Sequence, residues 1–307
     1  MNIVYALTAV VTLTLVPLFV DLLRSFAAFR RGALGRALSR AASASLVVAV
    51  GAICLIGLAL FLEHVLPYHC PERGSAGWWA LALSGVYLCG ATICWHMASV
   101  VVDPGRAPVQ EPSDPARALP PHARFCSVCR HSVLDADHHC LFTGKCVGRF
   151  NRFHFYAFLA HLLSAASFAV AVSWPPFRRC LLRRLLEPRD APRDPACVGV
   201  GAGQAALVPA LMVWVPIVPL VLWHALLLRA DLSTAHFVKR ANRSGIRAAV
   251  RELLARSRRP CENRAWQLAR GNYTRADELA RFDSPLGTGD VTAADGSLQG
   301  SHRPKAG

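Results

Sequence analysis

The residues best suited to chemistry lie together in one polar segment, residues 124–155, which reads RFCSVCRHSVLDADHHCLFTGKCVGRFNRFHF. Within it, the run Asp137-His138-His139-Cys140 places a carboxylate, two imidazoles and a thiol side by side. The thiolate is the nucleophilic form of cysteine, and a nearby histidine usually activates it. A carboxylate can in turn orient that imidazole. These residue types suit acyl transfer from a thioester, because the attacking and leaving thiols are matched in pKa.

The same segment could instead bind a metal ion. Cys126 and Cys129 form a C-x-x-C pair, which is a common half of a zinc site. A nucleophilic cysteine cannot also be a ligand of a saturated structural zinc, so the two interpretations compete for residues. Spacing alone does not choose the two further ligands that a tetrahedral site needs. The candidates are His131, His138, His139, Cys140 and Cys146.

Long apolar stretches on both sides of this segment must hold it in place. Hydrophobic residues make up 53% of the 307-residue chain, and only 17% are charged. Crossing the hydrocarbon of a bilayer takes roughly 20 helical residues. The composition therefore predicts an all-α, multi-pass membrane protein: a helical bundle with a small, irregular cytosolic domain between the third and fourth spans. The five candidate spans are Ile3–Val20, Ser45–Leu62, Trp78–Val102, Phe153–Ser173 and Ala205–Leu228.

Basic residues orient the predicted bundle. The formal net charge is +15, which by itself would suit nucleic acid or an anionic membrane surface. Spans on both sides of the cysteine-rich segment argue against nucleic acid. Segments 24–42 and 103–152 and the tail from Arg229 are basic, so we expect all three on the cytosolic side. The predicted organisation is an N-terminal membrane region, a cytosolic domain, two further spans and a basic tail, at residues 1–102, 103–152, 153–228 and 229–307.

Two features outside the central segment carry predictions of their own. Residues 237–257 combine arginines with apolar residues at helical spacing. Such a basic amphipathic helix could lie on the anionic inner leaflet or dock on the cytosolic domain, and the sequence leaves both open. Cys180 and Cys197 share a loop that this topology places in the lumen, where oxidising conditions favour a disulfide.

The motifs together resemble the DHHC cysteine-rich domain of protein S-palmitoyltransferases. Asp103-Pro104-Gly105 resembles the DPG motif of that family, and Thr234 lies where the family has its TTxE motif. The resemblance covers roughly residues 45–271, with spans and motifs in the family order. The residues of the central motif that match are Asp137, His138, His139, Cys140, Cys146, Val147, Gly148, Asn151 and Phe155.

The resemblance implies a role for each central residue. Cys140 would take a fatty acyl group from palmitoyl-CoA and pass it to cysteines of substrate proteins, with His138 as base and Asp137 orienting it. Substrate cysteines would be cytosolic and close to the membrane, and the acyl chain would lie among the spans. The family also implies an endoplasmic reticulum or Golgi membrane. One structural Zn²⁺ would be held by Cys126, Cys129, His139 and Cys146.

Departures from the family pattern divide into two groups. Most members hold two zinc ions, and all four ligands of one site are missing here: residues 107–123 contain no cysteine, and Phe125 and Ser132 replace two other ligands. This predicts a short, divergent member with one zinc. Close to Cys140, Leu141-Phe142 replaces the Pro-Trp of the family pattern and Lys145 replaces an Asn. Farther along the chain, His236 replaces the Glu of the TTxE motif. The alternative function is therefore a catalytically weak or inactive, DHHC-like membrane scaffold.

Overall fold

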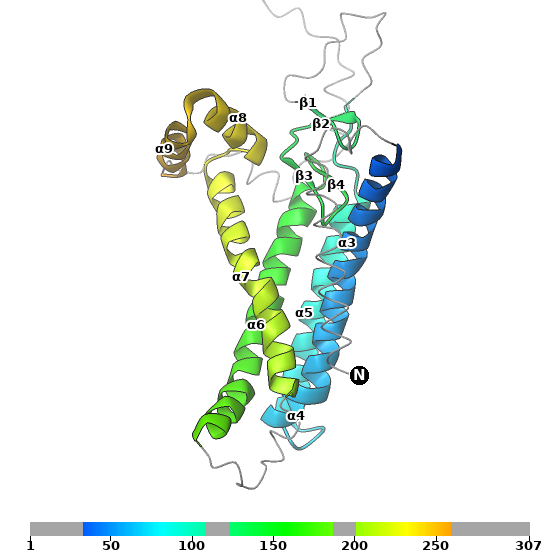
Figure 1. The fold of residues 1–307 in the computed structure, drawn as a ribbon, viewed down its shortest axis with the longest axis vertical. Helices are drawn as coiled ribbons and strands as arrows, with labels where there is room; N and C mark the ends of the chain where they lie inside the picture. Colours follow the sequence, from blue (N-terminus) through cyan, green and yellow to red (C-terminus); the bar gives the residue numbers. More distant parts are fainter. Residues whose placement is uncertain (1–32, 108–122, 187–200, 259–307) are drawn as a thin grey trace, which may run out of the picture.

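The computed structural model describes residues 33–107, 123–186 and 201–258. Long helices run along its longest axis as a bundle (Figure 1). Within the described residues, four segments are long and apolar enough to cross a membrane, which confirms the prediction of a helical membrane protein. The first predicted span, Ile3–Val20, lies outside the described residues. The helices are α3 (Ala33–Leu60), α5 (Ala76–Val101), α6 (Arg152–Leu186) and α7 (Gly201–Arg229).

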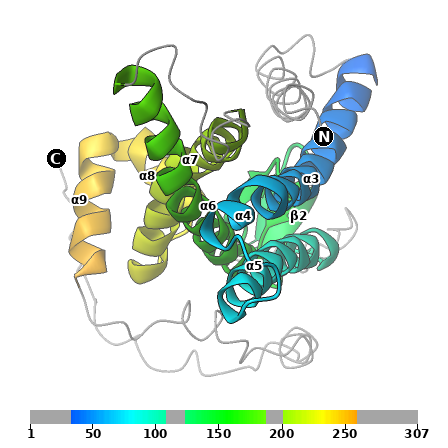
Figure 2. The ribbon, with the colours of Figure 1, turned by 90° about the horizontal axis from the view of Figure 1, so that it is seen from below.

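The first described crossing is longer than predicted. Helix α3 continues into a π-helical turn, η1 (Phe61–Val65), and a short helix, α4 (Leu66–His69). Phe61, Val65 and Leu66 are buried at the end of the bundle opposite the β-strands, and Phe168 of α6 packs against Phe61 with ring centroids 5.3 Å apart. Seen along the bundle axis, α3, α5 and α6 lie close together at this end (Figure 2).

Helix α6 extends beyond the predicted span, so the prediction of a loop from residue 174 is wrong as far as Leu186. The helix continues through Pro175 and Pro176, although proline has no backbone N–H for a helical hydrogen bond. Pro176 leaves the carbonyl of Val172 without its usual partner. His69 of α4 donates a hydrogen bond to that oxygen at 2.7 Å, which satisfies it from a neighbouring element.

Further along α6, Cys180 is disulfide-bonded. Its partner lies outside the described residues, so the predicted pairing with Cys197 stays a prediction. Cys70, which follows α4, is a free thiol. A disulfide at this end of α6 suits an oxidising compartment.

The segment between α5 and α6 forms two antiparallel hairpins, where the sequence predicted an irregular domain. Residues with positive φ shape its turns: Arg130 at 62°, Asp135 at 46° and Gly144 at 66°. Only glycine adopts such angles without steric cost. The turns at Arg130 and Asp135 therefore have no glycine to mark them in the sequence, and the strands that they connect were not predicted. The hairpins pair β1 (Ala123–Cys126) with β2 (His131–Leu134), and β3 (His138–Cys140) with β4 (Lys145–Val147).

The basic tail forms two helices after α7, α8 (Thr234–Ser244) and α9 (Ile246–Ser257). The predicted single helix over 237–257 is therefore wrong at Gly245, whose φ of 83° separates the two. Ser233 caps α8 by accepting a hydrogen bond from the backbone N–H of His236. Both helices lie at the same end of the bundle as the hairpins and the start of α3 (Figure 1), as expected for the three basic segments.

Candidate functional site

The Asp103-Pro104-Gly105 turn joins α5 to the hairpins. The Asp103 carboxylate accepts hydrogen bonds from the backbone N–H groups of Gly105 and Arg106, at 2.8 and 3.0 Å. Gly105 has φ of 94°, which favours glycine, and its carbonyl accepts a hydrogen bond from Leu134 N at 2.7 Å. The turn thus fixes the end of β2 directly above a membrane-length helix.

The Cys-Val-Gly-x-x-Asn run fixes β4 to the same helix. A Cβ atom on Gly148 would lie 2.3 Å from the carbonyl oxygen of Pro104, so only glycine fits there. Asn151 is fully buried, and its side-chain oxygen accepts a hydrogen bond from Gly148 N at 2.8 Å. Its amide nitrogen donates to the carbonyls of Ser99 and Cys146, at 3.2 and 3.0 Å. One side chain therefore links α5, β4 and the start of α6.

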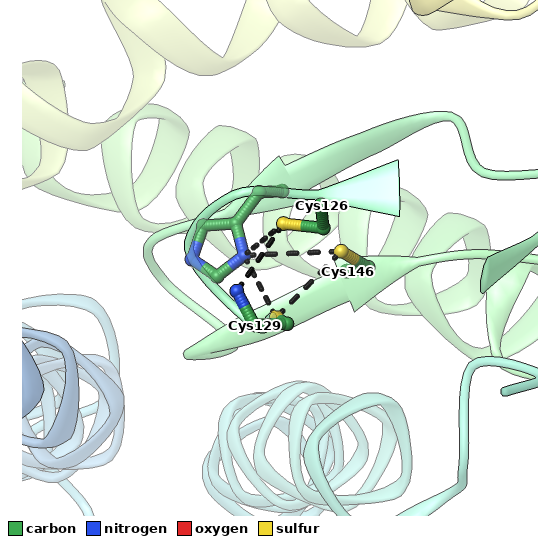
Figure 3. A group of neighbouring side chains, drawn as sticks. Cys126, Cys129 and Cys146 are labelled. Atoms are coloured by element: carbon green, nitrogen blue, oxygen red, sulfur yellow. Dashed lines mark hydrogen bonds between the residues drawn. The ribbon is translucent and has the colours of Figure 1, made fainter. Parts of the chain in front are cut away.

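Four side chains converge between the two hairpins. Figure 3 shows the sulfur atoms of Cys126, Cys129 and Cys146 turned toward one another and toward an imidazole. The imidazole is that of His139, whose Nδ1 lies 3.7, 3.3 and 3.9 Å from the three sulfurs. The sulfurs of Cys129 and Cys146 are 3.7 Å apart. These are the four residues that the resemblance implied as zinc ligands.

The spacing of these atoms fits a tetrahedral zinc ion. With Zn–S near 2.3 Å and Zn–N near 2.0–2.1 Å, the corners of a tetrahedron would be about 3.8 Å apart for two sulfurs and about 3.6 Å apart for a sulfur and a nitrogen. The cluster has these separations already. Hydrogen bonding to Cys146 and His139 lowers the pKa of Cys129 to about 3, which favours the thiolate that a metal requires. Four protein ligands would leave no open position, as in a structural site.

On the other face of β3, Asp137 orients His138. The Nδ1 of His138 donates a hydrogen bond to Asp137 Oδ2 at 2.7 Å, and the carboxylate is only 2% exposed. Thr234, at the start of α8, holds the same carboxylate from the tail. Its backbone N–H donates to Oδ1 at 2.6 Å and its hydroxyl donates to Oδ2 at 3.1 Å. The residue at the TTxE-like position therefore reaches the central motif through space.

The three residues shift one another's protonation. Burial would lower the pKa of His138, but hydrogen bonds to Asp137 and Cys140 raise it to about 9. Burial would likewise raise the pKa of Asp137, yet the bond from His138 outweighs it and lowers the pKa to about 2. The pKa of Cys140 is also lowered, because its contact with His138 outweighs burial. The arrangement favours an imidazolium between a carboxylate and a thiolate, which is an activated nucleophile.

Cys140 is buried where the hairpin meets the bundle, packed with Val147, Phe155 and Phe158. The loop after it is held from two sides. The Thr143 hydroxyl lies 3.3 Å from the carbonyl oxygens of both Cys140 and Lys145, and it can donate a hydrogen bond to either. His96 of α5 donates to the carbonyl of Phe142 at 2.8 Å. Because that contact uses the backbone of Phe142, the Leu-Phe departure leaves the loop anchored.

The sequence analysis did not identify His224 as a site residue. The structure places its Nδ1 4.0 Å from Asp137 Oδ2, and its ring centroid 5.5 Å from that of His138. The imidazole is 5% exposed, and its Nδ1 has no hydrogen-bond partner. Its position inside a membrane-length helix was the available signal, because ionisable residues there are functional candidates.

Arg149 follows Cys140 closely in the sequence. Its Nε donates to the carboxylate of Asp135 at 2.6 Å, which closes the turn between the hairpins. Arg152 bonds the Asp135 carbonyl as well. Lys145 is the residue opposite Cys140 in the β3–β4 pairing. Of these two basic residues, only Lys145 lies beside Cys140.

Comparison with known proteins agrees with this geometry. Residues 116–241 match the model of the DHHC palmitoyltransferase family. Palmitoyltransferase ZDHHC18 of Mus musculus is 48% identical over 56 residues, 18% of this chain and 15% of that protein. Palmitoyltransferase SWF1 of Saccharomyces cerevisiae is 36% identical over 55 residues, 18% of this chain and 16% of that protein.

The similarity to these relatives is thus confined to a short segment, because the chain covers less than one fifth of their length. The family model reaches further, from before the first hairpin into α8. It includes both the four-residue cluster and the Asp137-His138-Cys140 arrangement with its Thr234 contact. Over residues 116–241, the chain is therefore similar to the DHHC palmitoyltransferase family.

Proposed function

We propose that the protein is an S-acyltransferase that moves a fatty acyl group from acyl-CoA, through Cys140, to cysteines of other proteins. The observation that carries the proposal is the ordered contact from Asp137 to His138 to Cys140. It supplies a thiol of lowered pKa at the edge of the apolar bundle. A lipid-soluble chain and a water-soluble head could both reach that thiol.

The reaction would take two steps with the same residues. In the first, the Cys140 thiolate attacks the carbonyl carbon of the acyl-CoA thioester, the carbon–sulfur bond to CoA breaks, and the CoA thiolate takes a proton from His138. In the second, His138 takes the proton of a substrate thiol. The resulting substrate thiolate attacks the acyl carbonyl carbon on Cys140, and the Cys140 thiolate leaves. Asp137 keeps the imidazole oriented and stabilises its protonated form throughout.

The acyl chain would lie among the spans below Cys140. Phe155, Phe158 and Ile217 surround the thiol, and Leu162 packs on the same cluster. Leu162 also lines a cavity of about 120 Å³ between α3, α5, α6 and α7, whose walls are apolar. Ligand pockets usually measure about 300–1,000 Å³, so we expect the helices to separate as a chain enters.

The head of CoA would enter from the side of α8. A hollow of about 640 Å³ opens there beside Asp137 and His138. Lys239 and Arg243 line it and supply positive charge, as the phosphates of CoA require. Substrate proteins would present cysteines close to the membrane at this same end of the bundle. We place this end on the cytosolic side of an endoplasmic reticulum or Golgi membrane.

The zinc ion would be structural. Cys126, Cys129, His139 and Cys146 would hold it, and when bound it would supply the folding energy that joins the two hairpins. Asp137, His138 and His224 also lie close enough together to be considered as ligands. The hydrogen bonds of Asp137 to His138 and Thr234 already use that carboxylate, so we propose one zinc per chain.

Acyl transfer to a cysteine-containing acceptor protein tests the proposal against the scaffold alternative. With an alkyne-tagged palmitoyl-CoA, the purified protein should label the acceptor, and the Cys140→Ser variant should not. A scaffold would give no more labelling than that variant. Replacing Leu141 with Pro and Phe142 with Trp restores the family residues and measures what the departure costs. If only this double variant labels the acceptor, the natural chain is the scaffold.

A further inference from the structure

Helix α9 has one buried face and one exposed apolar face. Ala249 and Leu253 are buried against Leu227 and Ala230 at the end of α7. This contact fits the docking interpretation of the amphipathic tail, but it uses only part of the apolar surface. A stripe of three side chains next to it is 38–58% exposed: Ile246, Val250 and Leu254.

The position of α9 along the bundle places it at the level where the last candidate span ends. Leu227 belongs to the last turn of α7, which ends at Arg229, so α9 lies at the level where the membrane-length helix stops. Figure 1 shows α9 nearly end-on beside α7, whereas Figure 2, seen along the bundle axis, shows it lengthwise. The helix therefore runs across the bundle axis, and a membrane perpendicular to that axis would be parallel to α9.

Positive charge borders the apolar stripe. At 100° per residue, Arg247 and Arg251 follow the stripe around the helix, on the side away from the buried face. Across α8 and α9 there are six lysine and arginine residues and one acidic residue, Glu252. Glu252 is already paired with Arg240 and Arg256, each at 3.0 Å. The remaining charge beside the stripe is thus cationic.

We propose that this face of α9 is a binding surface for the anionic lipid headgroups of the membrane leaflet on the side of the hairpins. Ile246, Val250 and Leu254 would enter the boundary between headgroups and acyl chains, and Arg247 and Arg251 would contact lipid phosphates and carboxylates. A helix with an apolar stripe and a basic border is the usual interfacial element. A second copy fits less well, because a twofold contact through this stripe would bring like charges together.

The contact can be measured without any acyltransfer, so it succeeds or fails separately from the proposed function. The full-length protein is reconstituted in lipid nanodiscs, with an environment-sensitive fluorescent amino acid replacing Val250 in one sample and Ala255 in another. Ala255 is exposed on the opposite side of α9. Lipids with a spin label near the headgroup should quench position 250 more strongly than position 255. Adding phosphatidylserine to phosphatidylcholine should increase quenching at 250.

Charge variants test the role of the headgroups. A basic residue near an anionic surface contributes enough binding energy that Arg251→Gln should reduce the phosphatidylserine-dependent increase roughly fivefold. Arg178→Gln, near the other end of the bundle, is the matched control and should leave the increase unchanged. Equal quenching at 250 and 255 would overturn the membrane contact. Protection of 250 from both lipid and aqueous quenchers would mean that protein covers the stripe. Quenching at position 250 that does not change when phosphatidylserine is added would overturn the recognition of anionic headgroups.

Discussion

His138 and His139 are adjacent on strand β3, yet their side chains reach different partners. His139 faces three cysteine sulfurs within 3.9 Å, whereas His138 bonds a buried carboxylate at 2.7 Å on the other face. Successive side chains of a strand point to opposite faces. A three-residue strand can therefore place the proposed metal ligand and the proposed base next to each other in sequence and still keep their functions separate.

The two faces also depend on different parts of the chain. The His139 face is assembled from the two hairpins alone, within residues 123–147. The His138 face needs Thr234 from α8, and His224 of α7 lies beside it. We therefore expect damage to the first face to unfold the hairpins, and damage to the second to slow chemistry in a folded protein. The following predictions test that difference.

The largest effect is expected from Cys129→Ala. Structural zinc contributes about 10–16 kcal/mol to the folding of small zinc modules, so loss of one ligand should remove both the metal and the activity. Metal analysis should fall from one zinc per chain to nearly none. Cys94→Ala, which removes an exposed cysteine of α5, is the control and should keep one zinc. Two zinc ions per wild-type chain would show that the proposed ligand set is incomplete.

His138→Ala should slow self-acylation without removing zinc. General-base assistance is typically worth about 10²–10⁴-fold, and the substitution also removes the partner that lowers the pKa of Cys140. Single-turnover labelling with palmitoyl-CoA measures the rate, and metal analysis on the same sample measures the zinc. A loss of zinc equal to that of Cys129→Ala would mean that the two faces are not separate.

A smaller effect is expected from Thr234→Val. The change keeps the shape of the side chain and the backbone hydrogen bond, but it removes the hydroxyl that donates to Asp137 Oδ2. A buried acceptor left short of a donor costs about 1–3 kcal/mol, or roughly 5- to 150-fold in rate if the whole cost falls on the transition state. Thr234→Ser should restore most of the rate. Wild-type kinetics in Thr234→Val would show that the tail does not position Asp137.

The smallest effect concerns His224. An imidazole 4.0 Å from Asp137 is just beyond hydrogen-bonding distance, and such contacts can tighten during the reaction. We expect His224→Leu to lower the self-acylation rate severalfold and His224→Asn to recover part of it, because asparagine keeps a donor near the position of Nδ1. His161→Leu, a span histidine beside Trp95, is the matched control. Identical rates for the leucine and asparagine variants would limit His224 to packing.

The sequence predicted what depends on local pattern and missed what depends on contacts between distant segments. Apolar stretches located the four described spans, and the resemblance to the DHHC domain identified the four residues that cluster at His139. The extension of α6 was missed because His69, far along the chain, satisfies the carbonyl that Pro176 leaves free. His224 was missed for the same reason, since nothing in its neighbours points to Asp137. The break at Gly245 was the one local signal that was overlooked.

The central claim is that Cys140 carries the acyl group while a separate cysteine cluster carries the zinc. The direct test incubates wild-type protein and Cys140→Ser with tagged palmitoyl-CoA, maps the hydroxylamine-sensitive label by peptide mass spectrometry, and counts zinc in both. We predict label on Cys140 in the wild type, no such label in the variant, and one zinc per chain in each. Undiminished label in Cys140→Ser, or loss of its zinc, would contradict the account.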